Sequence, residues 1–213
     1  MSDLIIYGPP QSTYVRSTRM ACVEKGIDYR VEPIEFGGEL HMEMHPFGKI
    51  PVMRHGDFRL YETSAICRYV DHGFDGPPLM PADPQAAARA EQFMSCFSCY
   101  LYDDLIRRYV LQYIFPKGDD GQPDRWVIDA ALQDIRRDLA VLDAAYGERT
   151  WLAGEALSVP DLLVAPPLHY VAQMPEGDEL FAPHDNLKRA RAAIEARDSF
   201  IQTEPPPPQA DAA

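Results

Sequence analysis

The N-terminal part of the chain alternates between short apolar runs and segments with helical spacing. Leu4 to Tyr7 is an apolar run that predicts a strand, and the turn of residues 8–11 ends it. A helix is predicted to begin near Ser12 and to stop at Gly26. Tyr29 to Ile34 alternates as a second strand, which a right-handed crossover would place parallel to the first. The pattern therefore predicts a β-α-β unit.

A predicted hairpin follows, with its strands at Val52–Met53 and Arg59–Tyr61 and its turn at residues 55–57. Pro51 stands at the first position of this apolar run, where a strand tolerates a residue without an amide hydrogen. A proline there can be cis. The N–H and C=O of Ile50 would then be unpaired, and an extended peptide could dock against them as an extra strand.

A helix is predicted directly after the hairpin. Thr63 and Ser64 are residue types that cap helices, and apolar side chains such as Ile66 and Val70 then repeat at helical spacing. The N–H groups of such a helix start attract an anion, and the neighbouring Glu62 offers a carboxylate to an ammonium group. Together they suit the head of an α-amino acid, which carries both charges.

The rest of the chain reads as helical. Residues 36–44 are polar and predict a loop or one irregular turn, and residues 85–115 lack Pro and Gly and predict one long helix that can bend. Ser158 and Asp161 form a predicted capping box, a folding element worth about 1 kcal/mol. Further predicted features are a helix with apolar positions from Ile128 to Leu142, a kink at Pro166-Pro167 beside His169, and a final helix over residues 186–197.

Length and composition favour two domains in 213 residues. We expect one domain over residues 1–76, a Pro-rich linker over 77–84, a helical domain over 85–200 and a disordered Pro-rich tail over 201–213. The net charge of −13 argues against nucleic acid as a partner. No run approaches the roughly 18 apolar residues of a membrane span.

The N-terminus lacks the basic region of a signal peptide, so a cytoplasmic location is expected. The four cysteines lie in segments predicted to be helical, which favours buried, reduced thiols over disulfides. Cys96 and Cys99 form a C-x-x-C pair in the middle of a helix, without the second pair or His cluster of a metal site. No metal is expected.

Several short motifs occur in order along the chain, at residues 7–12, 24–26, 46–51, 62–66 and 158–161. With this set the sequence resembles the cytosolic glutathione transferases, most closely the bacterial Ser-type members related to the phi, theta and zeta classes. The resemblance implies an α/β thioredoxin-like N-terminal domain followed by an all-α helical C-terminal domain. It also implies conjugation of the thiolate of reduced glutathione, a co-substrate, to small hydrophobic electrophiles.

Ser12 falls where the Ser-type members carry their catalytic serine. Its hydroxyl would stand at a helix N-terminus, where the helix dipole favours a thiolate over a thiol. Arg16, one turn further on, is a candidate supplement to this effect. From the residues alone, Ser12 serves equally as a simple helix cap, and the neighbouring Thr13 and Tyr14 are alternative hydroxyl donors. No cysteine stands here, which argues against the branches that form mixed disulfides.

The resemblance assigns the other candidate site residues. A homodimer is implied as well, with Phe47 a candidate interface anchor. The residues expected to bind glutathione are His41, Lys49, Ile50, Pro51, Glu62 and Thr63, and those expected to line the electrophile pocket are Pro10, Tyr14, Tyr102 and Tyr109.

Two other functions remain open from the sequence. One is a glutathione-dependent isomerase, dehalogenase or ether-cleaving enzyme on the same fold, because the electrophile pocket decides the reaction. The other is a non-catalytic glutathione-binding or assembly module, because a fold does not fix a function.

Overall fold

A computed structural model describes residues 3–206. The chain divides into two compact units, which are described separately. Unit 1 holds the residues up to Leu79 and again those from Ala196 onward, and unit 2 runs from Met80 to Glu195. The division falls inside the predicted linker. The return of the chain to unit 1 at Ala196 was not predicted, and residues 207–213 of the predicted tail lie outside the described part.

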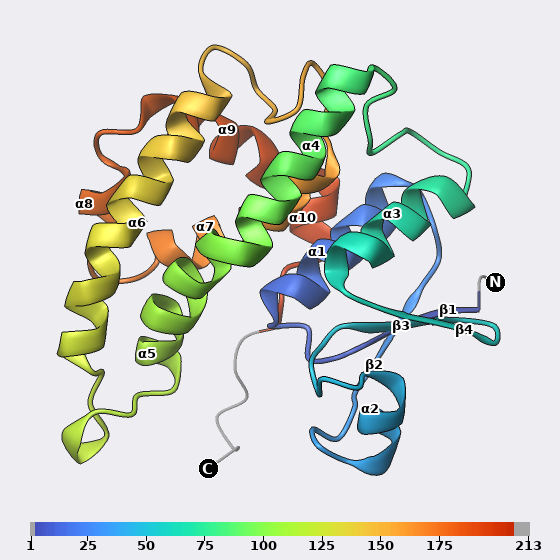
Figure 1. The fold of residues 1–213 in the computed structure, drawn as a ribbon, viewed down its shortest axis with the longest axis horizontal. Coiled ribbons are helices and arrows are strands. Elements are labelled where there is room, and N and C mark those ends of the chain that lie inside the picture. The colour runs from blue at the N-terminus through green and yellow to red at the C-terminus, as the bar shows by residue number, and fades with distance from the viewer. Residues whose placement is uncertain (1–2, 207–213) are drawn as a thin grey trace. The chain divides into compact units, whose positions relative to one another are not determined.

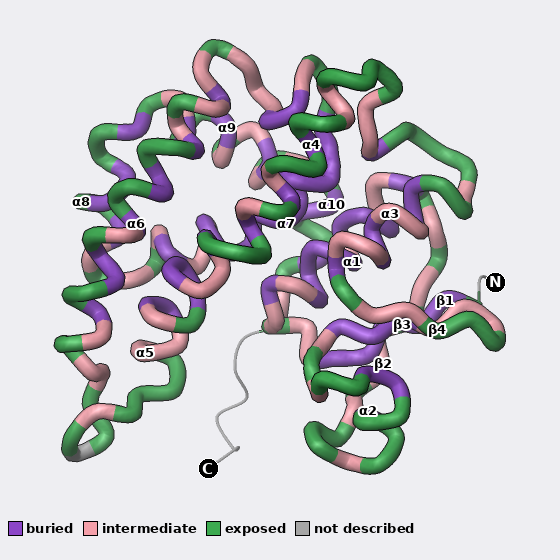
Figure 2. The backbone as a smooth tube through the Cα atoms, viewed as in Figure 1, coloured by how far each residue is buried: buried purple, intermediate pink, exposed green. Residues whose placement is uncertain are grey.

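Unit 1 contains a four-stranded sheet of order β2-β1-β3-β4 (Figure 1). Strand β1 is Leu4–Tyr7, β2 is Arg30–Glu32, β3 is Val52–His55 and β4 is Phe58–Tyr61. Strand β1 pairs with β2 in parallel and with β3 antiparallel, and β3 pairs antiparallel with β4. The predicted β-α-β unit and hairpin are therefore confirmed, and all four residues of β1 are buried (Figure 2).

Four helices accompany this sheet. They are α1 at Thr13–Glu24, α2 at Glu39–Met44, α3 at Thr63–Gly73 and α10 at Asp198–Gln202. The expectation of a loop or irregular turn over residues 36–44 was wrong, because six of these residues form α2. The helix is short and polar, so its sequence has almost no apolar period. Met44 nevertheless anchors it in a cluster with Ile5, Tyr7 and Val52.

A buried lysine joins the end of α1 to the chain that leads toward unit 2. Lys25 Nζ donates to the backbone oxygens of Asp71 at 2.9 Å and Gly76 at 3.3 Å, and it lies 3.5 Å from the Asp71 carboxylate. The same carboxylate accepts from the backbone N–H of Leu79 at 2.6 Å. The side chains of Lys25 and Asp71 are at most 5% exposed. Such a pair fixes geometry, because removing either partner leaves an uncompensated charge.

Unit 2 is all-helical, and the predicted long helix over residues 85–115 is confirmed. It is continuous through α4 (Pro84–Cys96), two π-helical stretches at Phe97–Leu101 and Asp103–Val110, and α5 (Leu111–Ile114). Helix α7, at Val159–Ala172, continues through Pro166 and Pro167. A short 3-10 turn lies at Asp119–Gly121, and the remaining helices are α6 (Arg125–Tyr146), α7 (Val159–Ala172), α8 (Gly177–Phe181) and α9 (Asp185–Glu195).

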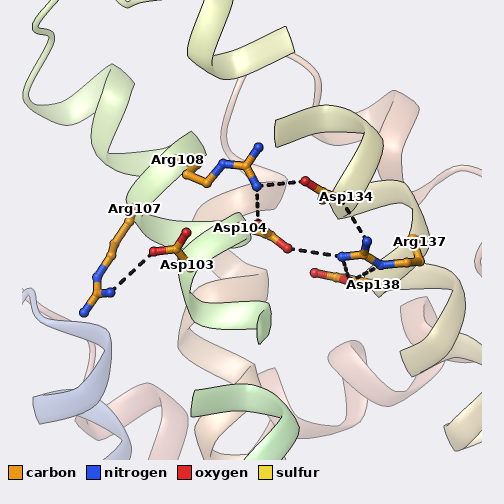
Figure 3. Close-up of polar contacts among 7 residues, drawn as sticks. All are labelled: Asp103, Asp104, Arg107, Arg108, Asp134, Arg137 and Asp138. Atoms are coloured by element: carbon orange, nitrogen blue, oxygen red, sulfur yellow. Dashed lines mark hydrogen bonds and ion pairs between the residues drawn. The ribbon is translucent and has the colours of Figure 1, made fainter. Parts of the chain in front are cut away.

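Three carboxylates and two guanidinium groups link the second π-helical stretch to α6 (Figure 3). Arg108 contacts Asp104 at 2.5 Å and Asp134 at 2.8 Å. Arg137 contacts Asp134 at 2.9 Å, Asp104 at 3.3 Å and Asp138 at 3.0 Å. One oxygen of Asp138, Oδ2, is buried and has no partner among the described residues. Burial, and to a smaller extent the nearby Asp104, raise the pKa of Asp138 to about 6 against the opposing effect of Arg137.

This raised pKa predicts a pH-dependent cost that Asp138→Asn removes. A carboxyl whose pKa is higher in the folded than in the unfolded state costs stability as the pH rises between those two values. From pH 4 to pH 7 we expect wild type to lose about 1–3 kcal/mol of unfolding free energy relative to Asp138→Asn. Urea denaturation of both proteins across this range measures it, and parallel pH profiles would contradict it.

The cysteines only partly follow the sequence prediction. Cys22 and Cys67 are buried, and burial raises the pKa of both thiols, that of Cys67 to about 12. Cys96 is half-buried and Cys99 is exposed, so the expectation of four buried thiols was wrong for this pair. All four are free thiols. Within residues 3–206, no helix is both long enough and apolar enough to span a membrane.

Candidate active site

The strand register brings the predicted site segments of unit 1 to one edge of the sheet. Tyr7 pairs with Val52, and Val52 pairs with Tyr61. The chain leaving β1, the chain entering β3 and the chain leaving β4 therefore meet at this edge (Figure 1). We call this end of the three strands the site edge, and it consists of residues 8–12, 49–51 and 62–63. Three segments that are separate in sequence are thus neighbours in the fold.

Gly8 is the point where two of these segments touch. Its φ is +140°, which side-chain-bearing residues rarely adopt. A Cβ there would lie 2.7 Å from Val15 Cγ2 and 3.4 Å from the side chain of Ile50. Because Gly8 has no side chain, Val15 in the first turn of α1 and Ile50 both lie close to its backbone. The sequence analysis treated Gly8 only as part of a turn, although a glycine directly after a strand is a signal of close backbone approach.

Ser12 is the N-cap of α1, with an extended backbone at φ −63° and ψ 128°. Its Oγ accepts a hydrogen bond from the backbone N–H of Val15 at 3.4 Å, and its carbonyl accepts from the N–H of Arg16 at 2.8 Å. The side chain is half-buried. Because Oγ acts as the acceptor in the cap, its own proton remains available for a donated hydrogen bond. The hydroxyl can therefore cap the helix and hold an anion at the same time.

The peptide bond between Ile50 and Pro51 is cis, as the sequence analysis considered. Pro51 is buried and Ile50 is half-buried. Among the described residues, the N–H and C=O of Ile50 have no backbone partner. These two backbone groups of Ile50 therefore offer one hydrogen-bond donor and one acceptor to an extended chain that lies along the site edge.

The third segment supplies the two charges predicted for an amino-acid head. Glu62 is the N-cap of α3, is exposed, and has φ +72°, in the left-handed region. No side chain caps this helix, in contrast to α1. The N–H groups at Thr63 and after it are therefore oriented toward an anion, while the Glu62 carboxylate suits an ammonium group. Thr63 itself is only 5% exposed.

Comparisons with known proteins match both parts of the chain to one family. A family model described as "Glutathione S-transferase, N-terminal domain" matches residues 11–72, and one described as "Glutathione S-transferase, C-terminal domain" matches residues 97–198. Together they cover most of the chain. The chain belongs to the glutathione S-transferase family.

Individual relatives match over nearly their whole length. Glutathione S-transferase 3 of Zea mays is 28% identical, with all of both chains covered. A solved structure of glutathione S-transferase III in apo form has a TM-score of 0.84 at 30% identity and covers 97% of this chain and 100% of its own. A glutathione S-transferase of Methylobacillus flagellatus, solved with glutathione bound, has a TM-score of 0.79 at 26% identity, covering 95% and 99%.

These matches confirm the predicted fold class, a thioredoxin-like domain plus an all-helical domain. The transferase names of the curated relatives support a glutathione S-transferase function for this enzyme. Within residues 3–206, no group of three or more His, Cys, Asp or Glu side chains is placed to hold a metal ion.

His41 does not lie as the resemblance implied for this transferase. The side chain is 1% exposed, its Nδ1 accepts from the backbone N–H of Gly37 at 3.0 Å, and its Nε2 lies 2.9 Å from the carbonyl of Lys49. Because Nδ1 is an acceptor, Nε2 carries the proton and donates to Lys49. Neither nitrogen is left for a ligand carboxylate, so His41 fixes the backbone before Ile50. The side chain of Lys49 itself is exposed.

Arg16 also differs from its predicted role. The side chain is fully buried, one guanidinium nitrogen donates to the carbonyl of Phe200 at 3.0 Å, and its carbon stands 3.9 Å from the centre of the Phe200 ring. A group without exposed surface does not touch a bound thiolate, so the predicted supplement by Arg16 would have to act without direct contact and stays a prediction. The sequence could not show this, since Phe200 is 184 positions away.

The proposed electrophile pocket receives less support from the structure. Tyr109 is fully buried within unit 2, where its hydroxyl donates to Glu176 at 2.9 Å, and burial together with this carboxylate raises its pKa. This position gives no support to the assignment of Tyr109 to the pocket, which stays a prediction. Pro10, Tyr14 and Tyr102 are half-buried and stay predictions.

One hollow of unit 1 does not include the site edge. It has a volume of about 310 Å³ and contains none of the residues predicted for the site. Its lining includes Tyr7 of β1, Met44 of α2, and Arg54 and Arg59, which face each other across β3 and β4. The site edge is therefore identified by its chemical groups and not by the depth of a cavity.

Proposed function

We propose that this transferase binds reduced glutathione along the site edge and joins it, through its thiol sulfur, to a small hydrophobic electrophile. The observation that carries the proposal is the convergence of the Ser12 hydroxyl, the Ile50 peptide group and the Glu62–Thr63 helix start on one sheet edge. Glutathione is an extended tripeptide with an α-amino acid head and a central thiol. The head, the central cysteine and the glycine carboxylate of glutathione occur in the same order as the groups of the site edge that would bind them.

Each segment has one binding task. The α-carboxylate of the head binds at the N–H groups of α3 near Thr63, and the ammonium group binds the Glu62 carboxylate. The central cysteine lies extended against the N–H and C=O of Ile50 beside Pro51. Lys49, exposed next to this peptide group, meets the glycine carboxylate at the other end. These contacts orient the thiol toward Ser12.

The thiol is activated by its position at the start of α1. A hydrogen bond from the Ser12 hydroxyl and the positive end of the helix dipole both stabilise the thiolate relative to the thiol. A free thiol near pKa 8.5 is only a few per cent ionised at neutral pH, so a decrease of about two units would ionise most of it. The thiolate sulfur then attacks the electrophilic carbon to form a C–S bond. In a substitution a leaving group such as chloride departs with the electrons of its broken bond, and in an addition the π bond breaks and the product takes up a proton. Binding both reactants makes the encounter effectively unimolecular.

The first prediction is a lowered pKa of the bound thiol. Glutathione bound to wild type should ionise with a pKa below about 7.5, compared with about 8.5 for a free thiol. Ultraviolet difference absorption of the thiolate, recorded against pH at saturating protein, measures it without any second substrate. Binding with an unshifted pKa, or no binding, would contradict the proposal and favour a non-catalytic module.

The electrophile itself separates conjugation from the related reactions. An isomerase, dehalogenase or ether-cleaving enzyme would show the same lowered thiol pKa, because it uses the same glutathione site. Product analysis distinguishes them, since only conjugation leaves a stable thioether to glutathione. Turnover of an activated aryl chloride to its glutathione thioether would support the transferase reaction.

A homodimer, a role in detoxification and a cytoplasmic location belong to the same proposal. Phe47 supports the dimer: it is 70% exposed, and its ring contacts His45 and Tyr61 edge-on with centroids 6.2 and 6.3 Å away. His45 is buried beneath it, and burial lowers its pKa. A large exposed aromatic side chain held on a firm base suits an interface anchor. Size-exclusion chromatography at the monomer mass would contradict the dimer.

A further inference from the structure

The C-terminal segment of the described chain lies along one face of α1. Arg16 Nη2 donates to the carbonyl of Phe200 at 3.0 Å, and Arg19 Nη1 donates to the carbonyl of Thr203 at 3.0 Å. These carbonyls lie at the end of the short helix α10, where helical partners run out. All of these residues belong to unit 1. Residues from more than 180 positions downstream thus hold the helix that begins at Ser12.

A second anchor holds the other end of α1. Arg197 binds the Glu24 carboxylate through two nitrogens, at 2.7 and 2.6 Å, and the Ser199 hydroxyl donates to the same carboxylate. The hydrogen bonds and charge of Arg197, together with Ser199, lower the pKa of Glu24 although burial opposes this. Paired guanidinium–carboxylate bonds fix direction as well as distance. Two anchors, one near each end, set the position of the whole helix.

We infer that residues 196–203 are a positioning element of the thiol site and act on Ser12 through Arg16. This inference rests on the proposed function. Arg16 is the link because its side chain and its backbone serve different partners. The buried guanidinium holds Phe200, while the backbone N–H makes the first α-helical hydrogen bond of α1, to the Ser12 carbonyl at 2.8 Å.

The environment of Arg16 makes this link stiff. The side chain is fully buried, and its guanidinium carbon lies 3.9 Å from the centre of the Phe200 ring. A desolvated cation on an aromatic face is attracted to it, and the planar group has little freedom between ring and carbonyl. Movement of Phe200 therefore moves the first turn of α1. A shift of the Ser12 hydroxyl by a fraction of an ångström weakens its hydrogen bond to the thiolate.

The test is Arg16→Met, which keeps an apolar side chain of similar length and removes the guanidinium. We expect the pKa of bound glutathione to rise by about one unit, and kcat at pH 6.5 to fall about tenfold. The KM for glutathione should stay within about twofold of wild type. The deficit in kcat should disappear at high pH, where the thiol ionises without help. A role in stability alone would not produce this recovery.

Lys25→Met is the matched control. It removes another buried cation from the C-terminal end of α1, but Lys25 binds Asp71 and Gly76 and not the C-terminal segment. It should lower the melting temperature and leave the bound thiol pKa unchanged. Phe200→Leu is the second test variant, in case Arg16→Met folds poorly. It keeps the backbone carbonyl and an apolar side chain, and should raise the thiol pKa by a smaller amount.

Ser12→Ala, measured in parallel, separates the two possible failures. If wild type lowers the thiol pKa and Ser12→Ala restores it, while Arg16→Met and Phe200→Leu both leave it low, the inference is overturned and the proposed function stands. If wild type does not lower the pKa, both are overturned. If Lys25→Met raises the pKa as much as Arg16→Met, general loosening of unit 1 explains the effect and the inference is again overturned.

Discussion

Ser12→Ala should lower kcat at pH 6.5 by up to roughly 50-fold, the value for loss of the whole pKa shift, while changing the KM for glutathione little. The estimate follows from ionisation: a thiol of pKa about 6.5 is half ionised at this pH, and one of pKa about 8.5 is about 1% ionised. Binding depends mainly on the groups at Ile50, Glu62 and Thr63, which the substitution leaves intact. Steady-state kinetics with an activated aryl chloride, together with the bound thiol pKa, measures both quantities.

Ser12 also caps α1, so the loss of the hydroxyl must be separated from the loss of the cap. The cap is worth about 1 kcal/mol of stability, and thermal unfolding reports it. Ser12→Thr keeps a hydroxyl and should retain most of the turnover. Thr13→Val and Tyr14→Phe remove the neighbouring hydroxyl groups and should leave the thiol pKa low. If Tyr14→Phe lost the activity and Ser12→Ala kept it, the assignment of Ser12 would be refuted.

The parts of the site that the sequence could predict are those fixed by local rules. Ser12 follows a strand and a turn, which places it at a helix start, and Pro51 stands at the head of a strand. The register Tyr7–Val52–Tyr61 then follows from the hairpin and the crossover. Local capping, turn chemistry and strand pairing were enough to bring the site segments to one edge.

The sequence was least informative about side chains whose surroundings come from distant parts of the chain. Arg16 looked like a cation beside the thiol, because one helical turn separates it from Ser12, but its side chain turns toward Phe200. The resemblance implied that Tyr109 lines the pocket, but its hydroxyl donates to Glu176 of another segment. Helical spacing predicts on which face of its helix a residue lies, but not which other segment of the chain packs against that face.

The same limit explains His41. A histidine in a polar stretch suggests an exposed ligand-binding side chain, and no local rule predicted that six residues would coil into α2 and bury it. Once buried, its nitrogens satisfy two backbone groups, of Gly37 and Lys49. A polar ring can be buried here because both partners are present. Its hydrogen bond to the Lys49 carbonyl therefore fixes the backbone at that position.

Asp161→Ala should have the largest effect on stability, about 3–5 kcal/mol. The carboxylate is fully buried. It accepts from the N–H and hydroxyl of Ser158 at 2.9 and 2.7 Å, from the N–H of Leu152 at 2.9 Å and from the hydroxyl of Tyr146 at 3.3 Å. Alanine leaves these donors buried without an acceptor, and each carries a desolvation cost. Urea denaturation followed by circular dichroism measures the loss.

Two matched variants show that the cost comes from the unsatisfied donors. Ser158→Ala removes only the capping hydroxyl and should cost about 1 kcal/mol. Asp161→Asn keeps the volume and one acceptor oxygen, so its loss should fall between the other two. Because Asp161 acts on folding and not on the thiol, the folded fraction of each variant should bind glutathione with the wild-type pKa. A stable Asp161→Ala protein with a raised thiol pKa would show that this capping box belongs to catalysis after all.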